Sequence, residues 1–176
     1  MSPSIVDTKP WLKFYDNIPA TIDYPQVSLY ERLMQTVQKY PNAIAWEFMG
    51  TEYTYKKFGE EVDRFANGLA AIGFKKGDVI TISMPTAPHG VIPFYAVNKL
   101  GGVCSMIHPL SPPPQIKMYL EISNSTFALT LDAFGKQFQE AIPGTKVKTL
   151  ILAQIQDYLQ GRSEERRVGK ECRSRW

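Results

Sequence analysis

The second half of the chain alternates short apolar runs with segments of helical pattern, and this alternation constrains the fold more than any other feature. The runs "VITISM", "VCSMI", "FALTL" and "VKTLIL" begin at residues 79, 103, 127 and 147. Their apolar, partly β-branched character is typical of strands in a parallel sheet covered on both faces. The intervening segments "VIPFYAVNKL", "SPPPQIKMYLEIS" and "DAFGKQFQEAI" indicate helices. Such alternation with short links predicts a doubly wound α/β domain with right-handed crossovers.

Capping and turn signals place the remaining elements. Ser28 with Glu31 three residues later forms a capping box that opens a helix, which Pro41 ends. "AIAWEF" and "EYTY" flank "MGT" and predict a β-hairpin. Thr54 can cap the next helix, and Gly73 is expected to end it in a left-handed conformation. That helix carries apolar residues at a 3.6-residue period: Phe58, Val62, Phe65, Leu69 and Ile72.

Two further signals mark where helices begin in the second half of the chain. Ser111 is expected to cap the helix that "SPPP" opens, and Pro88 is placed to begin the helix after the first core strand. The helix "VIPFYAVNKL" is apolar nearly all round, so we expect it to be deeply buried.

The chain divides into three parts. Residues 1–27 lack a helical or alternating period, and we expect an extended leader that packs on the domain through Trp11, Phe14, Tyr15 and Tyr24. Residues 28–161 form the α/β domain. Residues 162–176 form a basic tail of different composition.

The tail carries the whole net charge of the chain. Residues 1–161 hold 14 Lys and Arg against 14 Asp and Glu, whereas residues 162–176 hold six cations against three acids. Three interpretations compete: an arm that binds nucleic acid, a solvated disordered terminus, and the in-frame translation of a sequencing adapter joined to a truncated coding sequence. We favour the third, which makes the tail non-native.

Composition limits the cellular and redox setting. The N-terminus lacks the apolar core of a signal peptide, and no run approaches the roughly 20 apolar residues of a membrane span. Without the tail's Cys172, Cys104 stands alone in an apolar run, where a buried and inert thiol is expected. These features predict a cytoplasmic protein. Two histidines and one such cysteine cannot assemble a zinc site of the usual kind, so no metal ligands are assigned.

The ends of the predicted strands are where an α/β sheet binds its ligands. The loop "PTAPHG" offers a helix N-terminus, but Pro88 lacks an N–H, so a plain capped turn is favoured over an anion site. His89 is expected to face solvent. His108 follows the next strand without an apparent Ser, Cys or Asp partner, and a structural role is favoured over that of a general base.

The other polar groups are equally weak candidates. Lys136 is expected to be a surface lysine, and "SNST" at residues 123–126 has no glycine to fold around a phosphate. Glu60, Glu61 and Asp63 are expected on a solvated helix face. The sequence contains no G-x-G-x-x-G, Walker or G-x-S-x-G motif. No catalytic residue is therefore assigned, and cofactor-binding residues stay unknown.

The order of several stretches resembles the N-terminal region of the AMP-forming acyl-CoA synthetases, within the adenylate-forming superfamily. The resemblance rests on "YTYKKF", "GFKKGDVITISMPTAP" and "NKLGGVCSMIHPLSPP", and it covers about residues 10–142. The leader "WLKFYDNIPATIDYPQVSLYERL" is most similar to the long-chain fatty acid branch. His108 stands before Pro109 where the family usually has Asn or Asp.

The resemblance implies a parent enzyme that uses ATP, Mg²⁺ and CoA to convert a carboxylic, especially fatty, acid into an acyl-adenylate and then a thioester. It also implies that the phosphate loop, the adenine and ribose contacts and the catalytic lysine lie downstream, since none of those motifs occurs here. We therefore expect an N-terminal fragment, inactive alone, that binds none of these cofactors tightly.

As partners, the resemblance implies the missing downstream lobe and C-terminal domain, and a possible peripheral membrane contact of the parent, with no nucleic acid. The alternative is a freestanding α/β binding module whose basic tail binds nucleic acid.

Overall fold

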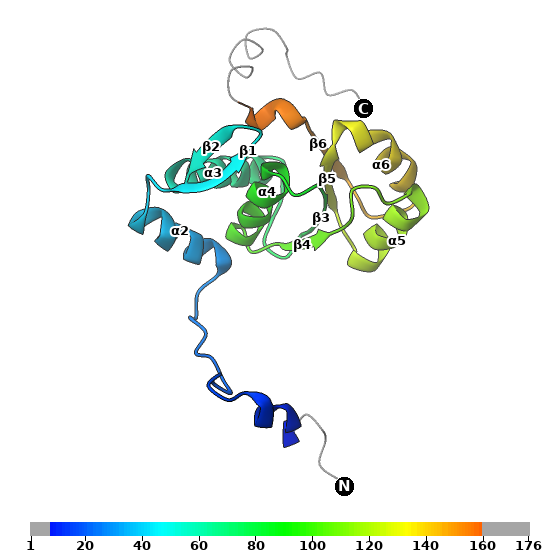
Figure 1. Ribbon diagram of the computed structural model, residues 1–176. Helices are drawn as coiled ribbons and strands as arrows, with labels where there is room; N and C mark the ends of the chain where they lie inside the picture. The colour runs from blue at the N-terminus through cyan, green and yellow to red at the C-terminus, as the bar shows by residue number, and fades with distance from the viewer. Residues whose placement is uncertain (1–7, 160–176) are drawn as a thin grey trace.

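The protein's structure, a computed structural model, describes residues 8–159. Its first elements are η1 (Pro10–Phe14), α2 (Leu29–Lys39), β1 (Ile44–Phe48), β2 (Thr51–Thr54) and α3 (Tyr55–Ala71). The alternating half follows as β3 (Val79–Ser83), α4 (Pro88–Lys99), β4 (Val103–Met106), α5 (Pro113–Ser123), β5 (Phe127–Leu131), η2 (Asp132–Phe134), α6 (Gly135–Ala141), β6 (Thr149–Ala153) and η3 (Ile155–Tyr158). Figure 1 shows their arrangement.

The four strands of the alternating half form one parallel sheet in the order β4-β3-β5-β6. In register, Ile80 of β3 lies opposite Cys104 of β4 and Phe127 of β5. The two central strands are almost wholly buried, as expected for a covered parallel sheet. The edge strand β4 differs, because Val103 and Met106 are exposed.

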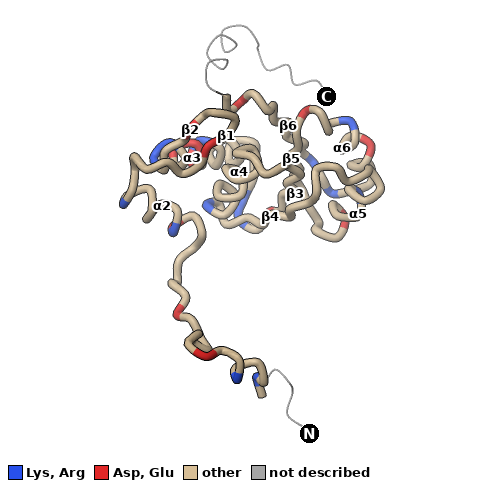
Figure 2. The backbone as a smooth tube through the Cα atoms, in the orientation of Figure 1, with Lys and Arg blue, Asp and Glu red and all other residues tan. Residues whose placement is uncertain are grey.

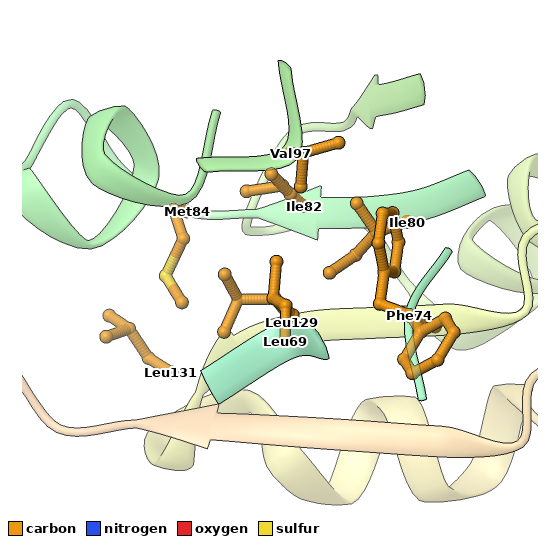
Figure 3. Packing of buried hydrophobic residues seen from close by; sticks show 9 residues of the cluster. Leu69, Phe74, Ile80, Ile82, Met84, Val97, Leu129 and Leu131 are labelled. Carbon is orange, nitrogen blue, oxygen red and sulfur yellow. The ribbon is translucent and has the colours of Figure 1, made fainter. Parts of the chain in front are cut away.

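Helices cover both faces of the sheet, which confirms the predicted doubly wound α/β class. On one face, α3 and α4 bury Leu69 and Val97 against β3 and β5, with Ile82 and Leu129 at the centre (Figure 3). On the other face, α5 and α6 pack Leu120 and Phe138 against β5. At about 25 cal/mol per Å² of apolar surface removed from water, these two layers supply the main driving force for folding.

An outer layer formed by α2 and the β1–β2 hairpin covers α3 and α4. Leu33 of α2 packs against Phe58 and Ile92, so α3 is enclosed between this layer and the sheet. The Ser28 capping box is present: the Ser28 hydroxyl accepts from the N–H of Glu31 at 3.1 Å, and the Glu31 carboxylate accepts from the N–H of Ser28 at 2.7 Å. The reciprocal pair satisfies two backbone donors that a helix start otherwise leaves open.

Other local predictions are also confirmed. The hairpin is antiparallel, the Thr54 hydroxyl caps α3 by accepting from the N–H of Lys57, and Pro88 is the first residue of α4. Gly73 has φ +91° after α3, a conformation that L side chains rarely adopt.

Two predictions are wrong. Ser111 does not cap α5: Pro112 occupies the N-cap position, and Ser111 is buried with its N–H donating to the carbonyl of His108. The described part of the leader does not pack on the domain through its aromatic residues, since Trp11, Phe14 and Tyr24 are exposed and the segment projects away from the sheet (Figure 1). The cause is its lack of periodicity, because no continuous apolar face is presented to the domain.

Candidate functional site

A cleft of about 440 Å³ lies beside the carboxyl end of β3, between the outer layer and the start of α4. Thr86, Ala87 and Pro88 form one side of the cleft, directly after β3. Helix α2 contributes Leu29 and Leu33. The remaining walls come from β1, α3 and the first turns of α4, through Trp46, Phe48, Phe58, Val91 and Tyr95 among others. This placement fits the rule that open α/β sheets bind ligands outside the carboxyl ends of their strands.

The lining determines what the cleft can hold. It is mainly aliphatic and aromatic, and its charged side chains are Arg32 and Glu47. Arg32 also donates to the Gln35 amide oxygen at 3.0 Å. No Ser, Cys or His is among the residues that line the cleft. Its chemistry suits an apolar group that carries at most a polar end.

The ring of Trp46 is fixed by its neighbours. It stacks on Tyr53 with the ring centroids 3.9 Å apart, and it meets Phe58 edge-on at 6.4 Å. The Trp46 indole N–H is buried without a hydrogen-bond partner among the described residues. The cleft therefore has one rigid aromatic wall, because stacked and edge-on rings resist reorientation.

The prediction that His89 faces solvent is wrong. Its side chain is 1% exposed, and its Nε2–H donates to the carbonyl of Gln154 at 2.8 Å. The ring meets Phe48 and Tyr158 edge-on, with centroids 5.9 and 4.7 Å away. Burial lowers the pKa of His89, while the hydrogen bond to Gln154 and the charge of Asp157 act in the opposite direction.

In the turn before α4, Ala87 occupies the N-cap position and makes no side-chain capping hydrogen bond. The backbone N–H groups of Gly90 and Val91 both donate to the carbonyl of Ala87, at 2.9 and 3.3 Å. Pro88 has no N–H to offer. The amides of Gly90 and Val91 are therefore used within the turn.

The structure places His108 in a loop, with a hydrogen bond to the backbone, and Lys136 on the surface. His108 is exposed in the loop after β4, where its Nδ1 accepts from the N–H of Leu110 at 3.2 Å. Lys136 is exposed on α6. The structure does not bring either of them to the cleft lining.

The hydroxyl-rich segment 123–126 serves the end of α5. The Ser125 hydroxyl is buried and lies 2.7 Å from the hydroxyls of both Thr81 and Ser123. Asn124 takes the left-handed conformation at the helix end. This network joins α5 to the central strand β3 and leaves no phosphate-binding loop.

The acids of α3 are less exposed than predicted. Glu60 is exposed, but the Glu61 side chain is only 11% exposed and pairs with Arg64. Asp63 accepts from the hydroxyl of Tyr30 at 2.9 Å and lies 2.9 Å from Nζ of Lys99. These contacts tie α2, α3 and α4 together.

Cys104 is half-buried beside α4, and burial raises the pKa of its thiol to about 11. Cys172 and the basic tail lie outside the described residues. Between residues 8 and 159, no group of three or more His, Cys, Asp or Glu side chains could hold a metal ion. In the same range, basic and acidic residues are interspersed and no element is covered by one sign (Figure 2).

None of the described helices is both long and apolar enough to cross a bilayer.

Sequence reasoning missed the cleft and the aromatic contacts of Tyr158. The apolar residues around the cleft are separated by up to 66 positions, and each alone has the pattern of an ordinary core residue. The available signal was the richness of "AIAWEF" and "EYTY" in aromatic residues, which indicated a strand pair without showing which face they share.

Comparison with known proteins identifies the relatives of this arrangement. A long-chain-fatty-acid–CoA ligase of Bacillus subtilis is 29% identical over 158 residues, which cover 86% of this chain and 27% of that protein. A 3-hydroxypropionyl-coenzyme A synthetase of Sulfurisphaera tokodaii is 41% identical over 110 residues, covering 61% of this chain and 17% of the relative. The chain thus spans about a quarter or less of the length of these relatives.

The fold also matches solved structures. The crystal structure of a long-chain-fatty-acid–CoA ligase from Archaeoglobus fulgidus gives a TM-score of 0.70 at 18% identity, covering 76% of this chain and 28% of the other. The N-terminal domain of FACL13 from Mycobacterium tuberculosis gives 0.68 at 24% identity, covering 73% and 34%. The family described as AMP-binding enzyme matches residues 33–172, a range that includes most of the basic tail. The chain belongs to the AMP-binding enzyme family.

Proposed function

We propose that residues 28–161 are part of the N-terminal lobe of an AMP-forming acyl-CoA synthetase that activates a carboxylic, and specifically a fatty, acid. The observation that carries the proposal is the family match, joined to a fold shared with fatty acid–CoA ligases. In the parent, the acid's carboxylate attacks the α-phosphorus of ATP and releases pyrophosphate. The CoA thiol then displaces AMP and gives the thioester.

The described residues do not by themselves form a site for Mg²⁺ and nucleotide. The cleft is largely apolar, the amides of Gly90 and Val91 at the start of α4 are used within their own turn, and no group of three or more His, Cys, Asp or Glu side chains between residues 8 and 159 could hold a metal ion. This chain supplies no catalytic step in the proposed reaction. Its role in the proposal is that of a framework: the parallel sheet holds the loops after β3 and β4 at one edge.

We further propose that residues 162–176 are non-native and that the native protein continues with a different sequence. The change in arginine content at residue 162 supports this. Sequencing the source DNA across codon 161 tests it. An open frame that leads into a glycine-rich phosphate loop is expected, and recovery of the arginine-rich stretch would contradict the proposal.

Expression of the full-length gene from the same DNA tests the function. Its purified product is expected to convert a fatty acid, ATP and CoA into the acyl-CoA, with release of one AMP for each thioester formed. A matched assay with acetate as the acid separates fatty from short-chain specificity. Formation of ADP, or no thioester from any acid, would contradict the proposed reaction.

A further inference from the structure

The turn that follows β6 meets the outer layer and α4 through Tyr158, whose ring contacts those of Tyr53 and His89. We call residues 154–158 the strap. The strap is closed on itself, since the N–H of Gln154 donates to the Asp157 carboxylate at 2.8 Å. It crosses from the sheet to α4 and the hairpin (Figure 1), where the Tyr53 hydroxyl donates to the carbonyl of Tyr158 at 3.3 Å. At its other end, Nε2–H of His89 donates to the carbonyl of Gln154 at 2.8 Å.

Both the neutral and the protonated ring can make the Nε2–H hydrogen bond to Gln154, so the effect of protonation lies at the other ring nitrogen, Nδ1. Because Nε2 donates to a carbonyl, the neutral imidazole carries no proton on Nδ1. That Nδ1 atom is buried and has no hydrogen-bond partner among the described residues. A proton added there would place a positive charge and an unpaired N–H between the rings of Phe48 and Tyr158. Burying such a group without a partner costs free energy.

The groups around the imidazole do not provide that partner. The negative charge of Asp157 on the strap acts to raise the pKa of His89. Burial lowers that pKa by more, so the net shift is downward. Burial raises the pKa of Tyr158, and that of Tyr53 to a smaller extent, so both phenols are neutral. Beyond these phenols lies the Glu61–Arg64 ion pair, whose opposite charges offset one another.

We propose that His89 is a proton-controlled latch: the neutral ring holds the strap against α4 and the hairpin, and the protonated ring releases it. Phe48 contacts His89 and also lines the cleft, so release of the strap also loosens one wall of the cleft.

Burial lowers the pKa of His89 below its ordinary value of 6.5. The open state, in which the strap is released, therefore takes up a proton more readily than the closed state, in which the strap is held. His89 therefore stabilises the closed strap fully at pH values above the ordinary pKa of 6.5, and this stabilisation weakens as the pH falls below 6.5.

Hydrogen exchange of the full 176-residue chain tests the latch. Protection of the strap amides is compared with that of the β3 amides at about pH 7.5 and about pH 5.5, after correction for the intrinsic exchange rate. The chain has two histidines, so His108→Gln is a matched control for His89→Gln. Glutamine can still donate a hydrogen bond to a carbonyl but does not titrate.

We expect strap protection in the wild type and in His108→Gln to fall by up to about tenfold per unit of pH below the ordinary histidine pKa, until His89 is protonated. Protection of β3 should stay constant, and His89→Gln should keep a pH-independent strap. A strap whose protection does not change with pH in the wild type overturns the proposal, as does an equal change in His89→Gln. If that variant does not fold, NMR titration of the wild type decides: a shared midpoint for the His89 ring and the strap amides supports the latch, and separate midpoints overturn it.

Discussion

Replacing Gly102 by alanine and Gly68 by alanine should change stability in opposite directions. A Cβ at Gly102 would lie 2.5 Å from ring carbons of Phe74 and 3.0 Å from Val97. The Phe74 ring cannot move away freely, because it is buried and meets Phe127 edge-on at 5.1 Å. Overpacking of this kind costs about 1–3 kcal/mol. The second glycine of "KLGG" is thus required by the close approach of the Phe74 ring.

Gly68 provides the matched control. It lies in α3, and a Cβ there would have no heavy atom within 4 Å outside its own helix turn. Alanine in an exposed helical position is more favourable than glycine by about 0.5–1 kcal/mol. Urea denaturation followed by circular dichroism measures both free energies of unfolding. The reasoning is refuted if Gly102→Ala unfolds at the wild-type urea concentration, or if Gly68→Ala lowers the free energy of unfolding.

Three further predictions follow from the packing and the ionised groups. Phe138→Ala should lower the free energy of unfolding by about 3–5 kcal/mol, because the ring is fully buried. Phe14→Ala removes an exposed ring and should change that free energy by no more than about 0.5 kcal/mol. Chemical denaturation measures both, and similar values for the two variants would contradict this prediction. In a Cys172→Ser background at neutral pH, Cys104 should react slowly with a thiol reagent, because its pKa of about 11 leaves little thiolate; labelling as fast as that of free cysteine would be the contrary result. Asp63→Asn weakens the acceptor for the Tyr30 hydroxyl and the Lys99 ammonium in a partly exposed site. We expect the free energy of unfolding to fall by about 1 kcal/mol or less. A thermal midpoint above that of the wild type would contradict this prediction.

The sheet and its helices could be predicted from the sequence because their signals are local. The period of α3, the capping box at Ser28 and the mainly apolar run of β5 each specify an element within a short window. Ser111 failed as a cap because Pro112 had an equally suitable extended conformation, one residue nearer the helix. The choice between adjacent caps depends on how the chain leaves the preceding loop, and the local pattern does not encode this.

His89 and the cleft could not be predicted because they depend on distant segments. A histidine in "PTAPHG" has the pattern of a loop residue, and its burial results from Phe48 and from Gln154, which lies 65 positions further along the chain. The cleft likewise needs α2, β1 and α4 to meet. The prediction for the leader was wrong for a different reason: its aromatic residues suggested packing, but Phe14 and Tyr24 are exposed.

Pyrophosphate–ATP exchange tests the central claim most directly, because it reports formation of the acyl-adenylate without requiring CoA. The 176-residue chain and the full-length gene product would be assayed side by side with a fatty acid, Mg²⁺, ATP and labelled pyrophosphate. We predict fatty-acid-dependent incorporation of label into ATP by the full-length protein and none by the 176-residue chain. Exchange by the 176-residue chain, or its absence from the full-length protein, would contradict the account.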